Sequence, residues 1–373
     1  MSNTPRPARG MALVLALTSC VWLASSPTSS AGQANSPMPS QSMTLSPSAI
    51  PVPPSLQSPA PSSSTRPIAV APPTGKADDG SYVQSETWLD PQMADLNVGS
   101  AAVGSVVPVR IIVPTGWSAD GDGTRWPVLF LLHGGKDSYA SWTRETNIES
   151  FVSTRNLIVV MPDNSAMALA TRWWNNGEEK PDYEAFDAVE LMQLMERDYH
   201  AKPKRAVAGV SSGGYGAMIL AAHYPRTFAA AASYSGIVDT TTPGASLLMM
   251  MGDLWQGYSP NAVWGDPNSS IGRRLRYENN PYSQAANLRG TSLFLSCGDG
   301  VGETAQDLAG KLGLWAEGRV LLPQNIAFIN RLKMLGIPAQ TDFYTGGIHD
   351  WISWKVAFAA SWPMLAAGLG LPS

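Results

Sequence analysis

The residues best suited to covalent chemistry form the turn Gly209-Val210-Ser211-Ser212-Gly213. This turn fits G-x-S-x-G, the nucleophile elbow, in which a serine is exposed on a tight strand-to-helix turn and small neighbours let the turn close. A buried-strand pattern precedes Ser211 and a helical pattern follows it. The alternative interpretation is a structural glycine-rich turn, whereas a phosphate-binding loop is excluded because no Gly-Lys-Ser/Thr follows the glycines. We therefore predict Ser211 as a nucleophile.

The general base must be a histidine that can reach this serine. In this type of site the chain order is serine, acid, histidine, and only His223 and His349 follow Ser211. His223 lies on the same predicted helix, about 18 Å away at 1.5 Å per residue, so it cannot reach the serine. His349 lies in a glycine-flanked loop between a predicted strand and the last helix. We predict His349 as the base.

The acid is expected in the loop that follows the predicted strand 292–296, before His349. Three carboxylates compete there, Asp299, Glu303 and Asp307. The acid would hold the histidine tautomer and stabilise the imidazolium that forms. The position of the loop by itself does not decide among the three.

Two backbone N–H groups are needed to stabilise an oxyanion. One is expected from Ser212, the residue after the nucleophile, and the other from the loop after an early central strand. The run Leu131-Leu132-His133-Gly134-Gly135 fits that loop, because its glycines let the backbone approach a substrate. We predict His133 to orient this loop rather than to act as the base.

Strand and helix patterns alternate along the part of the chain that carries these residues. Short apolar runs predict buried strands at 128–132, 157–161 and 206–210, and further strands are predicted at 106–113, 228–235, 292–296 and 340–344. Helical patterns cover 183–199, the segment after Ser211, 325–335 and 352–365. Pro108 suggests that the first strand lies toward a sheet edge. This alternation predicts an α/β fold with a mostly parallel central sheet and helices on both faces.

Composition excludes several classes of protein. The chain has 373 residues, of which 44% are hydrophobic and 14% charged, and its formal net charge is −4. Nucleic acid is therefore not an expected partner. The two cysteines, Cys20 and Cys297, cannot build a disulfide scaffold, and the four histidines form no zinc motif. We predict no metal and no cofactor.

The N-terminus has the pattern of an export signal followed by a spacer. Residues 1–31 combine arginines, an apolar run and a small-residue end at Ser29-Ser30-Ala31, which is typical of a signal peptide. Leu17-Thr18-Ser19-Cys20 resembles a lipobox, in which Cys20 would carry the lipid. Residues 32–78 are rich in Ser and Pro and predict a disordered linker, which leaves 79–373 for the catalytic domain. The expected location is secreted or cell-envelope associated, by a lipid anchor if Cys20 is modified.

Several motifs resemble one known family. LFLLHGG, AGVSSGGYGAMILAAHYP and GGIHDWISW are similar to the esterase D family of α/β-hydrolases, and within it to the secreted antigen 85 mycolyltransferases. MGDLWQGYSPNAVWGDP and SCGDG add to this likeness, which covers about residues 82–368. The resemblance implies an α/β-hydrolase fold and Ser211, His349, Gly135 and Ser212 as nucleophile, base and oxyanion donors. It favours Glu303 as the acid, with Asp299 as second choice.

The same resemblance implies substrate contacts and also departs from the family. Trp351 matches a tryptophan near the sugar-acceptor site of those relatives. Where the mycolyltransferases have Asp-Gly-Leu-Arg, this chain has His133-Gly134-Gly135-Lys136. His133 and Lys136 would therefore stand in the places of the acidic and arginine side chains that contact the sugar in those relatives. We expect a serine esterase or acyltransferase that acts on acyl esters, including lipid or sugar esters, through an acyl-enzyme. The alternatives are mycolyl transfer to trehalose or the cell wall, and a non-catalytic wall carbohydrate-binding protein that uses some of the 13 tryptophans.

Overall fold

The computed structural model of the protein describes residues 67–255, 257–301, 313, 316–347 and 349–372. The predicted signal peptide and the predicted linker up to residue 66 lie outside the described residues. Within the described ranges, no helix combines the length and apolar character that crossing a membrane requires.

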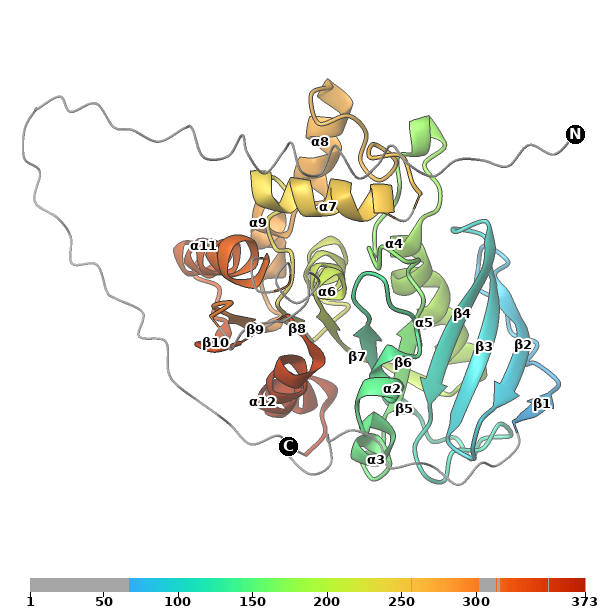
Figure 1. The fold of residues 1–373 in the computed structure, drawn as a ribbon. Coiled ribbons are helices and arrows are strands. Elements are labelled where there is room, and N and C mark those ends of the chain that lie inside the picture. Colours follow the sequence, from blue (N-terminus) through green and yellow to red (C-terminus); the bar gives the residue numbers. More distant parts are fainter. Residues whose placement is uncertain (1–66, 256, 302–312, 314–315, 348, 373) are drawn as a thin grey trace, which may run out of the picture. The chain divides into compact units, whose positions relative to one another are not determined.

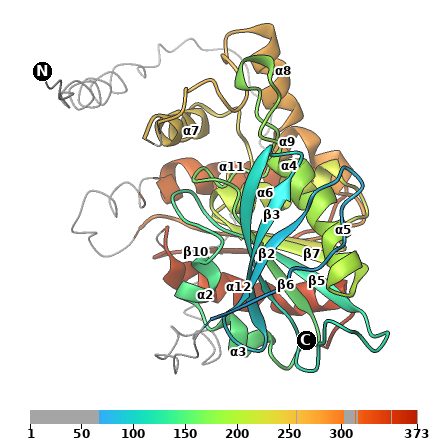
Figure 2. The ribbon, with the colours of Figure 1, turned by 90° about the vertical axis from the view of Figure 1, so that its right-hand side faces the viewer.

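A ten-stranded mixed sheet runs through the described part of the chain, with the strand order β1-β2-β3-β4-β6-β5-β7-β8-β9-β10. The strands are β1 (Ile68–Val70), β2 (Tyr82–Trp88), β3 (Met93–Ser100), β4 (Ser105–Ile112), β5 (Trp126–Leu132), β6 (Ile158–Pro162), β7 (Ala201–Val210), β8 (Ala230–Tyr234), β9 (Ser292–Gly298) and β10 (Gln340–Tyr344). The pairs from β6 through β5 to β10 are parallel, and β1 to β4 are antiparallel, as is the β4–β6 pair. Figure 2 shows β2 and β3 in blue at the antiparallel end.

Helices cover both faces of this sheet (Figure 1). On one face lie α2 (Ser141–Glu145), α3 (Ile148–Val152) and α12 (Trp351–Leu369). On the other lie α4 (Tyr183–Ala185), the π-helix η3 (Phe186–Glu190), α5 (Leu191–Asp198), α6 (Ser212–His223), α9 (Pro281–Gln284), η4 (Ala285–Leu288) and α11 (Leu322–Met334). The remaining helices are η2 (Asn175–Gly177), α7 (Pro243–Trp255), α8 (Ser270–Glu278) and the π-helix η5 (Ala316–Leu321).

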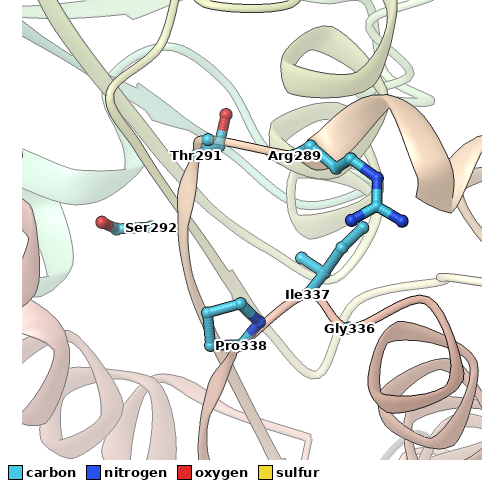
Figure 3. A pocket seen from close by; sticks show the side chains of 7 residues that line it. Arg289, Thr291, Ser292, Gly336, Ile337 and Pro338 are labelled. Carbon is cyan, nitrogen blue, oxygen red and sulfur yellow. The ribbon is translucent and has the colours of Figure 1, made fainter.

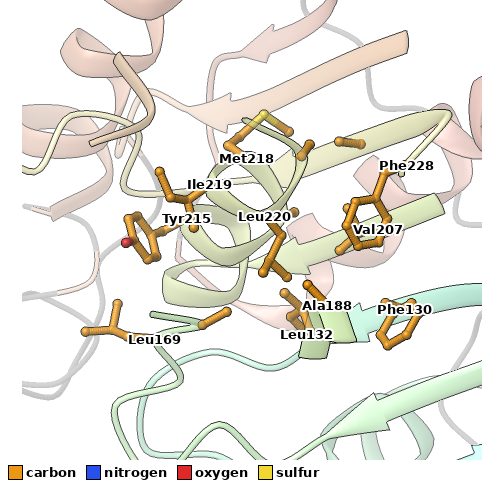
Figure 4. Packing of buried hydrophobic residues seen from close by; sticks show 14 of the residues in the cluster. Phe130, Leu132, Leu169, Ala188, Val207, Tyr215, Met218, Ile219, Leu220 and Phe228 are labelled. Carbon is orange, nitrogen blue, oxygen red and sulfur yellow. The ribbon is translucent and has the colours of Figure 1, made fainter. Parts of the chain in front are cut away.

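The central strands separate two hydrophobic clusters. Every residue of β5 is buried, and successive side chains alternate: Phe130 and Leu132 belong to the cluster beneath α6, Leu129 and Leu131 to the cluster beneath α12. This is the two-residue period of a strand that is covered on both faces. Figure 4 shows Leu220 of α6 in the first cluster with Leu132 and Phe130. The predicted mostly parallel sheet with helices on both faces is confirmed.

Two expectations about the N-terminal half were wrong. Pro108 lies in β4, which has β3 on one side and β6 on the other, so it is not at a sheet edge. The carbonyl of Pro108 accepts from the amide of Asp163, so its nitrogen also faces the β6 side rather than β3. The sheet accepts a proline there because the paired residues of β4 and β6 begin only at Val109. The predicted linker reaches residue 78, but Ile68–Val70 already pairs with β2 and Ala77 is buried.

Candidate active site

Ser211 occupies a strained turn between β7 and α6. Its backbone angles, φ 55° and ψ −121°, lie in a region that residues with a side chain seldom adopt. A Cβ atom on Gly209 would lie 2.2 Å from the carbonyl oxygen of Gly213, and one on Gly213 would lie 2.4 Å from the carbonyl oxygen of His133. Both flanking glycines are therefore required by close backbone packing. The turn presents a partly exposed Ser211 at the carboxyl end of a central strand.

His349 lies beside this serine. Its Nε2 is 2.9 Å from the Oγ of Ser211, and its side chain is 19% exposed. The imidazole comes from the loop between β10 and α12, where the carboxylate of Asp350 caps α12 by accepting a hydrogen bond from the amide of Ser353. The structure thus brings together the two residues that the sequence predicts as nucleophile and base.

The carboxylate that contacts His349 is Glu317, which the sequence analysis did not consider. Its Oε2 lies 2.7 Å from the Nδ1 of His349, and its side chain is completely buried. Glu317 belongs to the π-helix η5, which begins one residue before it. π-Helical turns are uncommon and frequently occur at functional sites. Ser211, His349 and Glu317 therefore form one continuous series of hydrogen-bonding side chains.

Several groups fix the other oxygen of the Glu317 carboxylate. Its Oε1 accepts hydrogen bonds from the amide of Gly298 at 2.8 Å and from the Oγ of Ser235 at 2.5 Å, and the thiol of Cys297 lies 3.4 Å away. Burial alone would raise the pKa of Glu317, but the hydrogen bonds and the charge of His349 outweigh it and hold that pKa below its usual value. Glu317 is thus kept as a carboxylate that can accept the Nδ1–H of His349.

Of the predicted acids, the structure describes only Asp299, which does not occupy this position. The Oδ1 of Asp299 accepts hydrogen bonds from the amides of Val301 at 2.9 Å and Gly346 at 3.0 Å, so this side chain holds two loops together. Glu303, the first choice, and Asp307 lie outside the described residues. Among the described residues, the carboxylate that engages the Nδ1 of His349 is Glu317 and not Asp299, the second choice.

The glycine-rich loop after β5 lies against the nucleophile. A Cβ atom on Gly134 would lie 3.4 Å from the Cβ of Ser211, and one on Gly135 would lie 3.6 Å from the Oγ of Ser212. Ser212 is the first residue of α6, where amide N–H groups lack partners within the helix and the helix dipole favours negative charge. The two predicted oxyanion donors, Gly135 and Ser212, therefore lie close to each other beside Ser211.

The three predicted substrate contacts lie in different environments. Lys136 is exposed and follows Gly135, and its amide donates a hydrogen bond to the carbonyl of Ala166. Trp351 is partly buried at the start of α12, with its ring edge-to-face against those of Trp142 and Trp354, the latter of which packs on His349. Both side chains are therefore at least partly exposed to solvent.

His133 is not a substrate contact. Its side chain is only 2% exposed, and both ring nitrogens are engaged: Nδ1 lies 2.8 Å from the carbonyl oxygen of Gly134, and Nε2 accepts a hydrogen bond from the amide of Asn164. Burial lowers the pKa of this histidine. The expectation of His133 as a substrate contact is therefore wrong, whereas its expected action on the loop agrees with these bonds.

A shallow cavity of about 300 Å³ lies away from these residues (Figure 3). Arg289, Thr291, Ser292, Ile337 and Pro338 contribute to its lining. Ser292 is the first residue of β9, whereas Gly298, which contacts Glu317, is the last. The cavity thus lies at the amino ends of the parallel strands, whereas Ser211 lies at their carboxyl ends. Among the described residues, no group of three or more His, Cys, Asp or Glu side chains could hold a metal ion.

Comparisons with known proteins identify the family and the relatives of this chain. Residues 100–365, more than half of the chain, match the sequence profile of the Esterase family, described as "Putative esterase". The chain is 29% identical over 293 residues to the diacylglycerol acyltransferase/mycolyltransferase Ag85B of Mycobacterium intracellulare, covering 74% of this chain and 84% of that protein. The predicted resemblance to the antigen 85 proteins is confirmed.

Solved structures show the same fold. MPT51 (FbpC1) of Mycobacterium tuberculosis superposes with a TM-score of 0.62 at 24% identity, covering 75% of this chain and all of that one. FphF, a fluorophosphonate-binding serine hydrolase of Staphylococcus aureus, gives a TM-score of 0.55 at 23% identity over 72% of this chain and 97% of its own. The predicted α/β-hydrolase fold is confirmed. With its profile match across residues 100–365, the chain belongs to this esterase family.

Proposed function

We propose that the protein is a serine esterase or acyltransferase in which Ser211, His349 and Glu317 act as one catalytic unit. The observation that carries this proposal is the unbroken connection from the Oγ of Ser211 through both nitrogens of His349 to a buried carboxylate. In this arrangement the serine has a base within reach and the base has an orienting acid, which together activate a hydroxyl as a nucleophile.

The reaction proceeds in two acyl transfers. His349 Nε2 takes the proton of Ser211 as the Oγ of Ser211 attacks the ester carbonyl carbon. The backbone N–H groups of Gly135 and Ser212 donate hydrogen bonds to the carbonyl oxygen and stabilise its negative charge. His349 then protonates the leaving alcohol, which leaves an acyl group on Ser211. An acceptor hydroxyl, activated in turn by His349, removes that acyl group and restores the serine. Glu317 accepts the Nδ1–H throughout and stabilises the imidazolium.

The acceptor is either water or the hydroxyl of a sugar or lipid. The relatives named diacylglycerol acyltransferase/mycolyltransferase support a hydroxyl acceptor. The loop His133-Gly134-Gly135-Lys136 differs from the Asp-Gly-Leu-Arg of the mycolyltransferases, which favours an ester substrate other than a trehalose mycolate. The export pattern of residues 1–31 supports a secreted or cell-envelope location for this activity, with a lipid anchor if Cys20 is modified.

A pre-steady-state assay with p-nitrophenyl esters of increasing chain length tests the proposal. We expect a burst of nitrophenol equal to one acyl group per folded molecule, and labelling of Ser211 by a fluorophosphonate. Ser211→Ala and His349→Ala are each expected to lower kcat by about 10⁶-fold, because the members of such a unit act together. His223→Ala is the matched control and should stay within a few fold of the wild type.

Two outcomes would contradict the proposal. Turnover by a correctly folded Ser211→Ala variant would exclude Ser211 as the nucleophile, and the absence of both burst and labelling would favour the non-catalytic carbohydrate-binding alternative. Addition of trehalose, glycerol or a diacylglycerol to the assay separates the two acceptors. A faster steady state with formation of the acylated alcohol identifies a transferase, whereas an unchanged rate identifies water as the acceptor.

A further inference from the structure

The peptide unit between Gly134 and Gly135 carries one of the proposed oxyanion donors. Its carbonyl belongs to Gly134 and its N–H to Gly135, and among the described residues the only cis peptide bond is elsewhere, at Lys180-Pro181. In a planar trans peptide the C=O and N–H point in opposite directions. A contact that fixes the carbonyl of Gly134 therefore also fixes the direction of the Gly135 N–H.

His133 makes that contact. Its Nε2 lies 3.2 Å from the backbone nitrogen of Asn164, which can only donate, so Nε2 is the unprotonated nitrogen. The proton is then on Nδ1, which donates to the carbonyl oxygen of Gly134 at 2.8 Å. His133 and Asn164 follow the carboxyl ends of β5 and β6, two neighbouring parallel strands. The backbone of Asn164 thus sets the tautomer and the position of the imidazole.

Asn164 is in turn held by a buried carboxyl group. Its Nδ2 donates to the Oδ2 of Asp187 at 2.7 Å, and Asp187, on the π-helix η3, is 0% exposed. The Oδ1 of Asp187 has no hydrogen-bond partner among the described residues. Burial raises the pKa of Asp187 well above its usual value, and the charges of Asp182, Glu184 and Glu190 add to the effect. The hydrogen bond from Asn164 opposes this shift. Asp187 thus offers its Oδ2 as a buried acceptor to Asn164, and nothing in the proposed reaction uses it directly.

We propose that Asp187 is a positioning residue for the oxyanion hole: through Asn164 and His133 it fixes the peptide unit that presents the Gly135 N–H to the substrate. The inference rests on the proposed function of Gly135 as an oxyanion donor. Loss of one such donor lowers kcat by about 10²–10³-fold in a serine hydrolase. A donor that is present but poorly directed should cost less, on the order of 10–100-fold.

The test compares variants of the full chain in the p-nitrophenyl ester assay, with the burst amplitude counting active molecules. Asp187→Leu removes the acceptor and is expected to slow acylation per active site by about 10–100-fold, with KM within about twofold of the wild type. Asp187→Asn keeps a neutral acceptor for Asn164 and should stay within about threefold. Its pH profile should superimpose on that of the wild type, because the proposed role of Asp187 is to accept the hydrogen bond from Asn164, and an asparagine keeps that acceptor.

A matched control separates positioning from general stability. Glu190→Leu also removes a buried carboxyl group from η3, one that bonds to Ser100 and Ala102 rather than to the oxyanion loop. It should lower the melting temperature but leave the acylation rate per active site unchanged. If Asp187→Leu does not fold, Asn164→Ala breaks the same link while it keeps the backbone donor to His133, and should slow acylation likewise.

Three results would overturn the inference: wild-type acylation per active site in Asp187→Leu or Asn164→Ala, an equal loss in Glu190→Leu, or a shifted pH profile in Asp187→Asn. Ser211→Ala distinguishes this failure from that of the proposed function. If Ser211→Ala is inactive and Asp187→Leu is normal, only the positioning role fails. If Ser211→Ala remains active, the proposed function itself is wrong.

Discussion

Glu317 combines complete burial with a carboxylate charge. A buried charge is costly unless it is paired and hydrogen-bonded. Its partners are His349, Ser235 and the amide of Gly298, and the indole of Trp354 in turn donates to the Oγ of Ser235 at 3.2 Å. Ser235 follows β8 with a φ of 50°, an unfavourable value that places its hydroxyl toward Glu317. Glu317, like Ser211, therefore depends on a neighbouring backbone in an unfavourable conformation and on closely placed hydrogen-bonding groups.

This environment predicts the effect of neutralising each carboxylate. Glu317→Gln should lower kcat on the order of 10⁴-fold with the fold intact, because a glutamine amide does not hold the required histidine tautomer or stabilise the imidazolium. Asp299→Asn should cost only a few fold, since its remaining oxygen still accepts from Val301 and Gly346. Kinetics of the single variants on one activated ester measure both effects.

Glu303→Gln completes the comparison, because the sequence favours Glu303. Near wild-type kcat in Glu303→Gln together with a severe loss in Glu317→Gln is the expected result. A severe loss in Glu303→Gln or Asp299→Asn, with Glu317→Gln near wild type, would show that another carboxylate reaches His349 in the working enzyme.

Glu317, the proposed acid, was not predicted from the sequence for a physical reason. The sequence pattern points to the loop directly after β9, because an acid of this kind usually lies close to a strand end in the chain. Glu317 is close to that strand end in space but 19 residues from Gly298 in sequence. One signal was available: Glu317 is the only acidic residue in the largely apolar run LGLWAEGRVLL, and Gly318 follows it. A Cβ on Gly318 would lie 2.2 Å from the carbonyl of Asp299, so this glycine permits the close return.

At the scale of elements, short apolar runs were the dependable signal. The predicted strand 128–132 lies within β5, because a strand that is buried on both faces needs an unbroken apolar run. The predicted strand 340–344 coincides with β10, an edge strand in which only Phe343 is buried. β2 and β3 were not predicted. Their burial alternates with exposed and partly exposed positions, and runs such as YVQSETW carry few apolar residues. The helices α7 and α8 were also missed, although α7 begins at Pro243 and Ser269 caps α8.

His223 joins three helices and gives a prediction at this scale. Its Nδ1 lies 2.9 Å from a carboxylate oxygen of Glu184 on α4, and its Nε2 lies 2.9 Å from the carbonyl of Glu278 at the end of α8. Two acceptors on opposite sides favour a doubly protonated ring. Burial opposes this charge, but the bonds to Glu184 and Glu278 outweigh it and raise the pKa of His223 above its usual value.

The raised pKa makes this contact pH-dependent. The stabilisation is complete below the unfolded-state pKa, about 6.5, and is lost as the pH rises through the folded-state value. His223→Ala should therefore destabilise the protein by roughly 1–2 kcal/mol at pH 5.5 and by clearly less at pH 9. Urea unfolding of wild type and variant at the two pH values measures the difference. Glu184→Gln should show the same trend, and an equal destabilisation at both pH values would contradict it.

At the scale of the whole molecule, the boundary of the catalytic domain is set by contacts that begin before residue 79. The amide of Gly75 donates to Asp198, and Asp78 exchanges hydrogen bonds with Gln193, so the segment 75–81 lies along α5. Ala77 and Ser81 are buried, 5% and 1% exposed. This segment anchors the end of the Ser/Pro-rich stretch to the domain, far in sequence from the helices it contacts.

Truncation tests this boundary. Deletion of residues 1–66 should leave a soluble domain with an unchanged ester burst, because no described contact is removed. Deletion of residues 1–81 should lower the free energy of unfolding by on the order of 2 kcal/mol or more, since it removes β1, two buried residues and the polar contacts with α5. Chemical denaturation and burst amplitude of both truncations give the comparison. Equal stability of the two proteins would show that the domain begins at β2 and that the segment 75–81 contributes nothing to its fold.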